Sequence, residues 1–363
     1  MQFPIQLRAR QRNGGIMLWL SPLAALGLTV LAGAILFACL GQDPVRALQV
    51  FLLAPLESVR GWAEVGVKMT PLLLCACGLV ICFRANVWNI GAEGQFLTGA
   101  ILGGWVALHC PAWLGFWSIP CVLAAGVAGG ALWAGVTALL RDRFHANEIL
   151  VSLMLVYVAQ FALAYCVQGP MQDPEGLGFP QSPLFETYTL LPILVSGTRL
   201  HVGFALAVLA AVVMELVLSR TFIGFQFKVS GIAPLAAKYA GYGTRRLLWI
   251  SLLLSGALAG LAGICEVTGP VGQLTLTISP GYGFAAIIVA FVGRLSPAGC
   301  IPAAFVMALF YLGGELGQSR LGLPSSITGV YQGMLLFFLL ICDTWIAFKP
   351  VWVGFGTGKK EAK

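Results

Sequence analysis

A polar, glycine-rich stretch stands directly before a long apolar run and carries groups that could contact a solute. It reads Asn86-Val-Trp-Asn89-Ile-Gly91-Ala-Glu93-Gly94-Gln95. Ionisable side chains at membrane depth are costly and usually face a bundle interior or a wet cavity, so Glu93 is a candidate functional residue. The alternative is a solvated turn in which Glu93 stabilises a helix N-terminus. On the first interpretation, the side chains of the stretch offer hydrogen-bonding groups, and its glycines bring backbone groups close to a solute. The candidate pathway residues are Asn89, Gly91, Glu93, Gly94 and Gln95.

A second glycine-rich stretch has the same relation to a later apolar run. It reads Thr277-Ile-Ser279-Pro280-Gly281-Tyr-Gly283-Phe, and the run at 281–294 is too short to cross about 30 Å as a straight helix. Interrupted segments of this kind line the binding sites of transporters built from inverted repeats. Gly281 and Gly283 therefore join the candidate pathway residues.

The segment from Ser219 to Arg246 indicates contact with a partner. It contains five basic residues and no acidic one. Pro234 suits the first turn of a helix, and Gly241 and Gly243 would end it. A short helix between two spans could dock on another protein or lie on anionic lipid headgroups. The candidate contact residues are Gly231, Pro234, Ala237, Lys238, Tyr239 and Gly241.

Other chemistries find little support in the residues. The tail Gly354–Lys360 lacks the glycine spacing and the hydroxyl of a phosphate-binding loop. The ten cysteines form no CxxC pair, and the three histidines lie far apart, so no metal site is expected. No grouping typical of a catalytic site appears in the spans. The net charge of +7 comes without a basic stripe, which argues against nucleic-acid binding.

The composition shows which environment positions these residues. Of 363 residues, 59% are apolar and 10% are charged, and the mean hydropathy is +0.90. A soluble chain is about one quarter charged, so most of this chain is suited to hydrocarbon. Apolar runs of about 20 residues predict ten transmembrane helices. They are 16–40, 66–84, 88–109, 116–140, 148–168, 201–219, 246–267, 281–294, 297–315 and 326–348.

Basic residues are distributed unevenly between the two sides of these spans. A cytoplasmic N-terminus places sixteen of the 21 Lys and Arg residues inside and five outside. Since cytoplasmic loops carry the excess of positive charge, both termini are expected in the cytoplasm. Eight spans with two re-entrant pieces would fit this bias nearly as well.

Two of these stretches resemble one transporter family. "NVWNIGAEGQFLTGA" resembles a signature of permease subunits of ABC importers of the branched-chain amino acid and simple-sugar type, in the nucleoside or purine branch. "GIAPLAAKYAGYGTRR" resembles the cytoplasmic coupling segment of that branch, which docks on the ATPase. Sugar permeases of the family tend to carry an Asp-Leu-Ser-Val-Gly-like sequence where this chain has Asn89-Ile-Gly-Ala-Glu93-Gly, which favours a nucleoside.

The resemblance implies a function and partners. The chain is expected to be the permease subunit of an ATP-driven importer in the bacterial inner membrane, carrying a small polar solute, a nucleoside, by alternating access. A second permease in a heterodimer, cytoplasmic ATP-binding subunits, an external substrate-binding protein and lipid would complete the system. This chain would need no cofactor and no ATPase site of its own, because ATP and Mg²⁺ belong to the partner. The alternatives are a simple-sugar ABC permease and an ion-coupled secondary transporter.

The expected fold is an all-α polytopic membrane protein with about ten transmembrane helices in two inverted-repeat halves, spans two to five and seven to ten. Residues 1–15 would form a basic cytoplasmic N-terminus. Residues 16–348 would form the transmembrane permease domain, with the coupling segment at about 220–246. Residues 349–363 would form a basic cytoplasmic tail.

Overall fold

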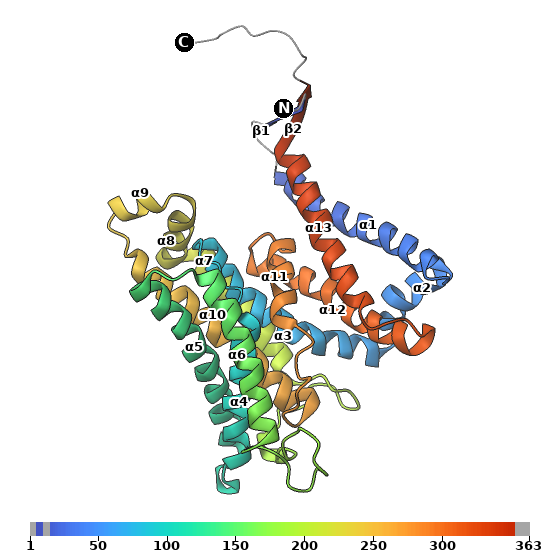
Figure 1. Cartoon of the computed structure of the whole chain (residues 1–363), viewed down its shortest axis with the longest axis vertical. Coiled ribbons are helices and arrows are strands. Elements are labelled where there is room, and N and C mark those ends of the chain that lie inside the picture. The colour runs from blue at the N-terminus through green and yellow to red at the C-terminus, as the bar shows by residue number, and fades with distance from the viewer. Residues whose placement is uncertain (1–4, 10–14, 353–363) are drawn as a thin grey trace.

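The computed structural model describes residues 5–9 and 15–352, and it describes side chains from residue 20 to residue 346. The described chain is almost entirely helical (Figure 1). The α-helices are α1 (Gly15–Cys39), α2 (Pro44–Leu48), α3 (Val59–Arg84), α4 (Ala92–His109), α5 (Ser118–Phe144), α6 (Glu148–Gln168), α7 (Val202–Arg220), α8 (Phe222–Ile232), α9 (Pro234–Tyr239), α10 (Thr244–Glu266), α11 (Tyr282–Val292), α12 (Pro297–Leu321) and α13 (Ile327–Ala347).

Shorter helical turns and one strand pair connect or extend these helices. The 3₁₀ and π turns are η1 (Gln49–Leu53), η2 (Ala54–Leu56), η3 (Ala112–Trp117), η4 (Thr187–Thr189) and η5 (Val267–Val271). Strands β1 (Ile5–Ala9) and β2 (Phe348–Trp352) pair in antiparallel fashion beyond α1 and α13. The all-α prediction did not include this small ribbon, which joins two segments far apart in the sequence.

Each of the ten predicted spans corresponds to one helix: α1, α3, α4, α5, α6, α7, α10, α11, α12 and α13. Eight helices of the described chain are long and apolar enough to cross a membrane. The other two are α4, with 18 residues, and α11, with 11. At 1.5 Å per residue, α11 is only about 16 Å long and cannot cross the hydrocarbon core. The polytopic helical class is confirmed, and so is the unusual length of the eighth predicted span.

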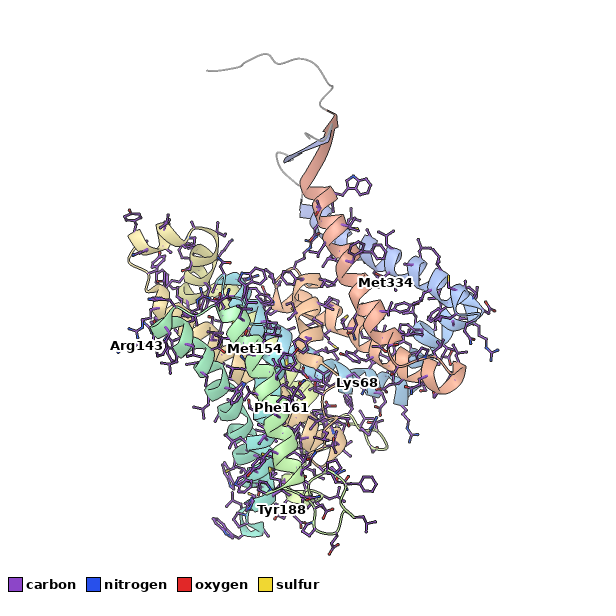
Figure 2. The ribbon with its side chains drawn as sticks, viewed as in Figure 1. Lys68, Arg143, Met154, Phe161, Tyr188 and Met334 are labelled. Carbon is purple, nitrogen blue, oxygen red and sulfur yellow. The ribbon has the colours of Figure 1, made fainter. Side chains whose placement is uncertain are left out.

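The arrangement in Figure 1 defines two ends of the bundle. The helix α9 and the strand pair lie towards the same end, which we call the inner end, following the predicted orientation. The long α6–α7 connection lies at the opposite, outer end. Exposed apolar side chains such as Met154 and Phe161 cover the outward face of α6 (Figure 2), as expected for a surface that meets lipid or another membrane subunit.

The core is centred on α3 and α10. The most apolar part of α3 is almost wholly enclosed, and α10 packs against α3, α4 and α5. The α5–α10 contact is close because glycines face glycines there. A Cβ on Gly130 would collide with the carbonyl oxygen of Gly256, and a Cβ on Gly256 would collide with that of Gly130. Small residues let membrane helices approach in this way, so these glycines hold α10 in the position from which it contacts the candidate site.

Candidate solute pathway and coupling segment

The two glycine-rich stretches meet inside the protein, although 190 positions separate them in the sequence. The backbone N–H of Gly283 donates a 2.7 Å hydrogen bond to Oε2 of Glu93. A Cβ on Gly283 would collide with the backbone nitrogen of Glu93, so only glycine permits this approach. The Glu93 side chain is only 2% exposed. The two interrupted segments that the sequence analysis assigned to one pathway therefore meet in the structure, although the part of Glu93 and Gly283 in transport stays a prediction.

The helices that begin at this point run in opposite directions. From Ala92, α4 leads to His109, near the outer loops. From Tyr282, α11 leads to a turn at the inner end, where Nε of Arg84 donates to the carbonyl oxygen of Leu295 at 2.6 Å. Helix N-termini carry partial positive charge, so the Glu93 carboxylate lies between two favourable dipoles. This geometry is the one expected where two inverted halves meet.

Asn89 is the centre of a closed hydrogen-bond network. Its Nδ2 donates to Oε1 of Gln95 and to Oγ of Ser255, each at 3.0 Å. Its Oδ1 accepts from the backbone N–H of Gly91 at 3.0 Å and from Nε2 of Gln95 at 3.1 Å. Asn89 and Gln95 are both buried. Because Ser255 lies near the middle of α10, this network holds the approach to α4 deep within the bundle.

The glycines of the first stretch pack against α6. A Cβ on Gly91 would come within 2.9 Å of Cβ of Ser152, and one on Gly94 within 3.0 Å of Cα of Val156. The Ser152 hydroxyl also accepts the backbone N–H of Ile90 at 3.2 Å. The sequence analysis expected Gly91 and Gly94 to admit a solute to backbone groups. In this conformation that space is filled by α6, so both glycines provide close helix packing.

The second stretch turns sharply into α11. Gly281 has φ of 91°, in the left-handed region that favours glycine, and it is the N-cap residue of the helix. The Ser279 hydroxyl accepts the backbone N–H groups of Gly281 and Tyr282 at 3.2 and 3.1 Å. The Tyr282 hydroxyl is buried and has no hydrogen-bond partner among the described residues. The approach to α11 is therefore less completely hydrogen-bonded than the approach to α4.

A group of charged residues near the outer end was not recognised from the sequence. Nζ of Lys68 lies 2.8 Å from a Glu315 oxygen, and both Nε and Nη2 of Arg199 bond to Glu64, at 2.9 and 2.6 Å. The predicted start of the second span, at 66, placed Glu64 outside it. The helix begins earlier because Ser58 caps it, accepting a hydrogen bond from a backbone N–H of the first turn. The spacing of Glu64 and Lys68, four residues apart, was the available signal.

Three acidic residues near helix ends have surroundings that their sequence neighbours do not indicate. Glu266 is buried, and its Oε2 has no hydrogen-bond partner in the described chain. Glu215 accepts hydrogen bonds from Ser296 and from the backbone of Ala298 at the start of α12. Asp343 pairs with Arg294. For Glu215 and Asp343 the fold supplies partners from distant parts of the chain.

The predicted coupling segment forms α8 and α9 at the inner end. As predicted, Pro234 is the first residue of α9, and Gly241, with φ of 79°, lies just past its end. Tyr239 is 92% exposed and Leu235 is 75% exposed. Lys238 is also exposed, but Ala237 is fully buried and faces the protein. Of the predicted contact residues, Lys238 and Tyr239 are therefore accessible at the inner end and Ala237 is not, while Leu235, which was not among them, is accessible; their contact with a partner stays a prediction.

Gly231 connects this segment to the candidate pathway. A Cβ on Gly231 would collide with the carbonyl oxygen of Arg84, at the end of α3. Arg84 is followed by the stretch that leads to Asn89. The end of α8 therefore rests directly on the turn that begins the approach to α4.

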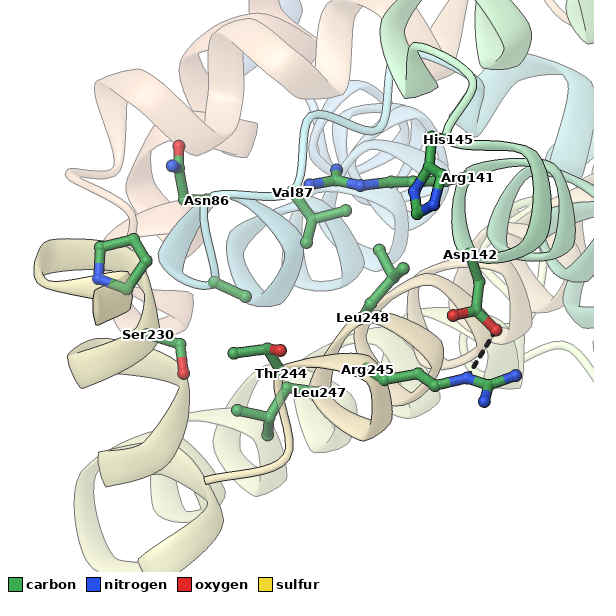
Figure 3. Close-up of a pocket in the computed structure, with 12 residues that line it drawn as sticks. Asn86, Val87, Arg141, Asp142, His145, Ser230, Thr244, Arg245, Leu247 and Leu248 are labelled. Atoms are coloured by element: carbon green, nitrogen blue, oxygen red, sulfur yellow. Dashed lines mark hydrogen bonds and ion pairs between the residues drawn. The ribbon is translucent and has the colours of Figure 1, made fainter. Parts of the chain in front are cut away.

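A pocket of about 330 Å³ lies beside this contact (Figure 3). Its lining includes Asn86 and Ser230, and on the opposite side Nε of Arg245 lies 2.7 Å from Oδ2 of Asp142. The same carboxylate accepts the indole N–H of Trp249 at 3.1 Å. The pocket lies between the coupling segment and the inner ends of α5 and α10.

Comparison with known proteins places the chain in a family. Residues 62–342 match the family described as branched-chain amino acid transport system / permease component. The chain belongs to this family of permease components, as the resemblance predicted. It is 34% identical to the glucose ABC transporter permease protein of Haloferax volcanii, an alignment that covers 94% of this chain and 92% of that one.

Two further relatives are named as permeases for nucleosides. The chain is 29% identical to the nucleoside ABC transporter permease protein of Lactococcus lactis subsp. cremoris, over 89% of this chain and 90% of the relative. It is 28% identical to the guanosine ABC transporter permease protein of Bacillus subtilis, over 88% and 92%. The similarity extends over nearly the full length of each relative, so it includes both glycine-rich stretches and the coupling segment.

Proposed function

We propose that this chain is the membrane-spanning permease subunit of an ATP-driven importer and carries a small, neutral, polar solute of the nucleoside class. The observation that carries this proposal is α9, a short helix that presents Leu235 and Tyr239 to the surroundings at the inner end. A lipid-facing position would not explain a helix held between α8, whose end rests on the turn that leads to the pathway, and α10. An exposed apolar pair suits insertion into a groove of an ATPase subunit.

Movement of α9 would reach the pathway by a short route. The end of α8 contacts the carbonyl oxygen of Arg84 through Gly231, and the next residues lead to the Asn89 network. Packed elements of this kind move as units, because close-packed contacts do not deform continuously. Closure of the ATPase pair would therefore shift the approach to α4 relative to α11.

The solute would cross where those two approaches meet. The hydrogen bond between Gly283 and Glu93 closes this point in the present conformation. Alternating access requires the two halves to separate around the site, so this contact would part during the cycle. Asn89 and Gln95 would keep the α4 side in shape, while Gly281 lets the α11 side turn.

The family and its relatives support a set of partners. A second permease, in a heterodimer, would complete the pathway, a cytoplasmic ATPase pair would bind ATP and Mg²⁺, and an external binding protein would deliver the solute. The chain would lie in the bacterial inner membrane with residues 1–15, the coupling segment and residues 349–363 in the cytoplasm. This orientation places sixteen of the 21 Lys and Arg residues on the cytoplasmic side, and that excess of positive charge supports it.

Nucleosides are the favoured solute class because two relatives that match almost the whole chain are named for nucleoside or guanosine transport. The sequence at Asn89–Gly94 favours the same class. A simple sugar is the second candidate, since the relative with 34% identity is named a glucose permease. Nucleosides and sugars share hydroxyl groups, and both would suit hydrogen-bonding residues that hold a solute weakly.

Purification and uptake would test this function together. We expect an affinity-tagged chain, isolated from its native membrane, to carry stoichiometric ATPase subunits and a second permease. Cells that produce the whole system should take up labelled guanosine or glucose in a manner that requires the binding protein and ATP. Uptake by the lone chain that is abolished by collapsing an ion gradient would contradict the proposal and favour a secondary transporter.

A further inference from the structure

A polar pocket opens at the outer end between α12 and α13, separate from the buried contact of Glu93 and Gly283. Its volume is about 230 Å³. Its lining consists of polar side chains, with glycine and proline between them: Pro280, Tyr311, Gly314, Glu315, Gln318, Ser325, Thr328, Gly329 and Gln332. Six of these side chains are polar, and Glu315 and Gln318 are exposed, so a polar solute can reach the pocket from the surface of the helix pair.

The lining of the pocket includes a buried hydrogen-bond donor, Nε2 of Gln332. The Gln332 side chain lies beside the hydroxyl of Tyr311, which donates to the carbonyl oxygen of Pro280 at 3.4 Å. A primary amide carries two N–H groups, and only one of them can be directed at the Tyr311 hydroxyl. Buried amide donors are normally satisfied by protein, water or ligand, so the second N–H, together with the surrounding space, points to a group that enters the pocket.

The pocket adjoins the proposed crossing point. The ring of Tyr311 packs edge-on against that of Tyr282, with centroids 5.2 Å apart. Tyr282 is the first residue of α11 and is followed by Gly283, which contacts Glu93. One layer of aromatic side chains thus separates the pocket from the meeting point of the two interrupted helices.

The charge and size of the pocket restrict its ligand. Glu315 is the acidic lining residue, and its carboxylate is already paired with Lys68 at 2.8 Å. The remaining lining side chains are neutral, so a neutral ligand fits better than an anionic one. A volume of about 230 Å³ is below the ~300–1,000 Å³ of drug-sized ligand sites, which suits a small solute or one end of a larger one.

We propose that this outer pocket is a resting site for the transported solute, which it holds through hydroxyl groups, with Gln332 and Tyr311 as residues that determine specificity. The inference rests on the proposed transport function and adds to it a defined location and ligand chemistry. Sugar hydroxyls can accept from the Gln332 amide and donate to Glu315 or Thr328. The shared chemistry is a neutral solute with neighbouring hydroxyls, which either a ribonucleoside or a monosaccharide can supply.

Uptake by the complete transporter, at matched levels of inserted permease, tests the pocket. The solutes are uridine, deoxyuridine and dideoxyuridine, which differ only in sugar hydroxyls, and glucose. Gln332→Leu should lower uptake of the hydroxyl-bearing solute by roughly 3- to 10-fold, the effect of one lost hydrogen bond. Dideoxyuridine uptake should fall by less than about twofold, because the contact is already absent for that solute.

Two controls make the result specific. Gln168→Leu, at an exposed glutamine on α6 that does not line the pocket, should transport all solutes normally. ATP hydrolysis stimulated by the loaded binding protein should stay within about twofold of wild type in Gln332→Leu, since docking precedes solute entry. Gln332→Met keeps the side-chain length without the donor, and it decides the question if Gln332→Leu fails to insert.

The outcomes separate the two proposals. An equal loss of uptake for every solute in Gln332→Leu would assign Gln332 a structural role, and unchanged uptake would remove Gln332 from the solute's route. Either result overturns the proposal that the pocket is a resting site. Wild-type uptake would remain intact in both cases, so the transport function would stand. If the wild-type system takes up neither the nucleosides nor glucose, the transport proposal fails whatever the variants do. If Gln332→Leu selectively loses uptake of uridine, the transported solute is a nucleoside. If it selectively loses uptake of glucose, the transported solute is a sugar.

Discussion

The approaches to α4 and α11 have similar glycine-rich sequences but opposite states of hydrogen bonding. In the α4 approach, Asn89 uses both side-chain atoms, and Gln95 and Ser255 complete the network. Around the α11 approach, the hydroxyl of Tyr282 is buried without a partner among the residues that the structure describes, and the buried amide of Gln332 keeps an N–H group that the neighbouring Tyr311 hydroxyl cannot accept. The same sequence pattern therefore serves two purposes.

Under the proposed function, this difference assigns the α4 side to the scaffold and the α11 side to contact with the solute. A satisfied buried network rigidifies its surroundings, whereas an unsatisfied buried group is costly unless something else binds it. Glu266, also near the outer end, has one unpartnered carboxylate oxygen and extends the unsatisfied region. The α4 side would thus transmit movement from the coupling segment, and the α11 side would face the solute.

Breaking the contact between the two approaches should have the largest effect. In Gly283→Ala, the added methyl group would meet the backbone of Glu93 and Ala92, which cannot rotate aside. Overpacking of this kind costs roughly 1–3 kcal/mol, so uptake should fall about 10- to 100-fold at matched insertion. Gly333→Ala is the control, since a Cβ there would have no heavy atom within 4 Å. Normal uptake by Gly283→Ala would show that the close approach is dispensable.

A substitution on the exposed face of α9 tests whether an ATPase partner moves the α4 side through this helix. Tyr239→Asp places a charge on the apolar docking surface, and we expect about a tenfold loss of uptake with ATP hydrolysis retained. Tyr239→Phe keeps the ring and should transport normally. If Tyr239→Asp transports as well as wild type, α9 is not the coupling contact.

Ala237 serves a different purpose in the same experiment. Because it is fully buried, Ala237→Asp should place an unpaired charge inside the protein and reduce the amount of inserted chain. Immunodetection in membranes would measure this loss. Uncoupling without loss of inserted protein in Ala237→Asp would instead support the original assignment of Ala237 to the docking face.

Removing groups from the α4 side should have intermediate effects that differ between residues. Asn89→Ala deletes four hydrogen bonds and leaves Gln95 and Ser255 with lost partners, so uptake and thermal stability should both fall, the latter by roughly 1–3 kcal/mol. Glu93→Gln keeps an oxygen that can accept from Gly283 and should lower uptake only a few-fold. The affinity of the binding protein should not change in either variant.

These two variants also test the solvated-turn alternative, which predicts normal transport by both. Labelled-nucleoside uptake and a thermal-unfolding assay in detergent would be measured on the same preparations. A stable Asn89→Ala variant that transports normally would remove the network from the mechanism, and an unaffected Glu93→Gln variant would remove the carboxylate from the pathway.

The smallest effect on transport is expected from His201, at the N-terminus of α7. Burial lowers the pKa of His201 to about 4, and its Nε2 has no partner among the described groups. The unfolded chain, with an ordinary pKa of about 6.5, therefore binds a proton between these values that the folded chain does not. Stability should be full above about pH 6.5 and decrease, by up to about 3 kcal/mol, as the pH falls towards 4.

Thermal unfolding of the purified chain between pH 4.5 and 7.5, roughly the range set by these two values, would measure this dependence. His201→Asn does not titrate and can still cap α7, as the Nδ1 of His201 now does for the backbone N–H of Gly203. It should flatten the profile. His109→Asn, at an exposed position, should leave it unchanged. A profile unaltered in His201→Asn would assign the acid sensitivity to another group.

The sequence alone determined the ten long apolar helices and α9, because each depends on local patterns, whereas the short α2 and α8 were not predicted. Long apolar runs located ten helices in order, the short run at 281–294 predicted the short α11, and Pro234 with Gly241 bounded α9. The glycine-rich stretches also indicated where the two halves would meet, since interrupted helices have a common role in transporters. These features require no knowledge of which helices are neighbours.

Only the tertiary structure decided which groups face one another. The bond from Gly283 to Glu93 and the bond from Asn89 to Ser255 join residues far apart in the sequence. Rotation of α9 about its axis turned Ala237 inwards and Tyr239 outwards, which a six-residue helix cannot reveal by periodicity. Glu266 is the last residue of α10, a position that water often reaches, yet it is buried. Burial and pairing are properties of packed surfaces, so the fold had to supply them.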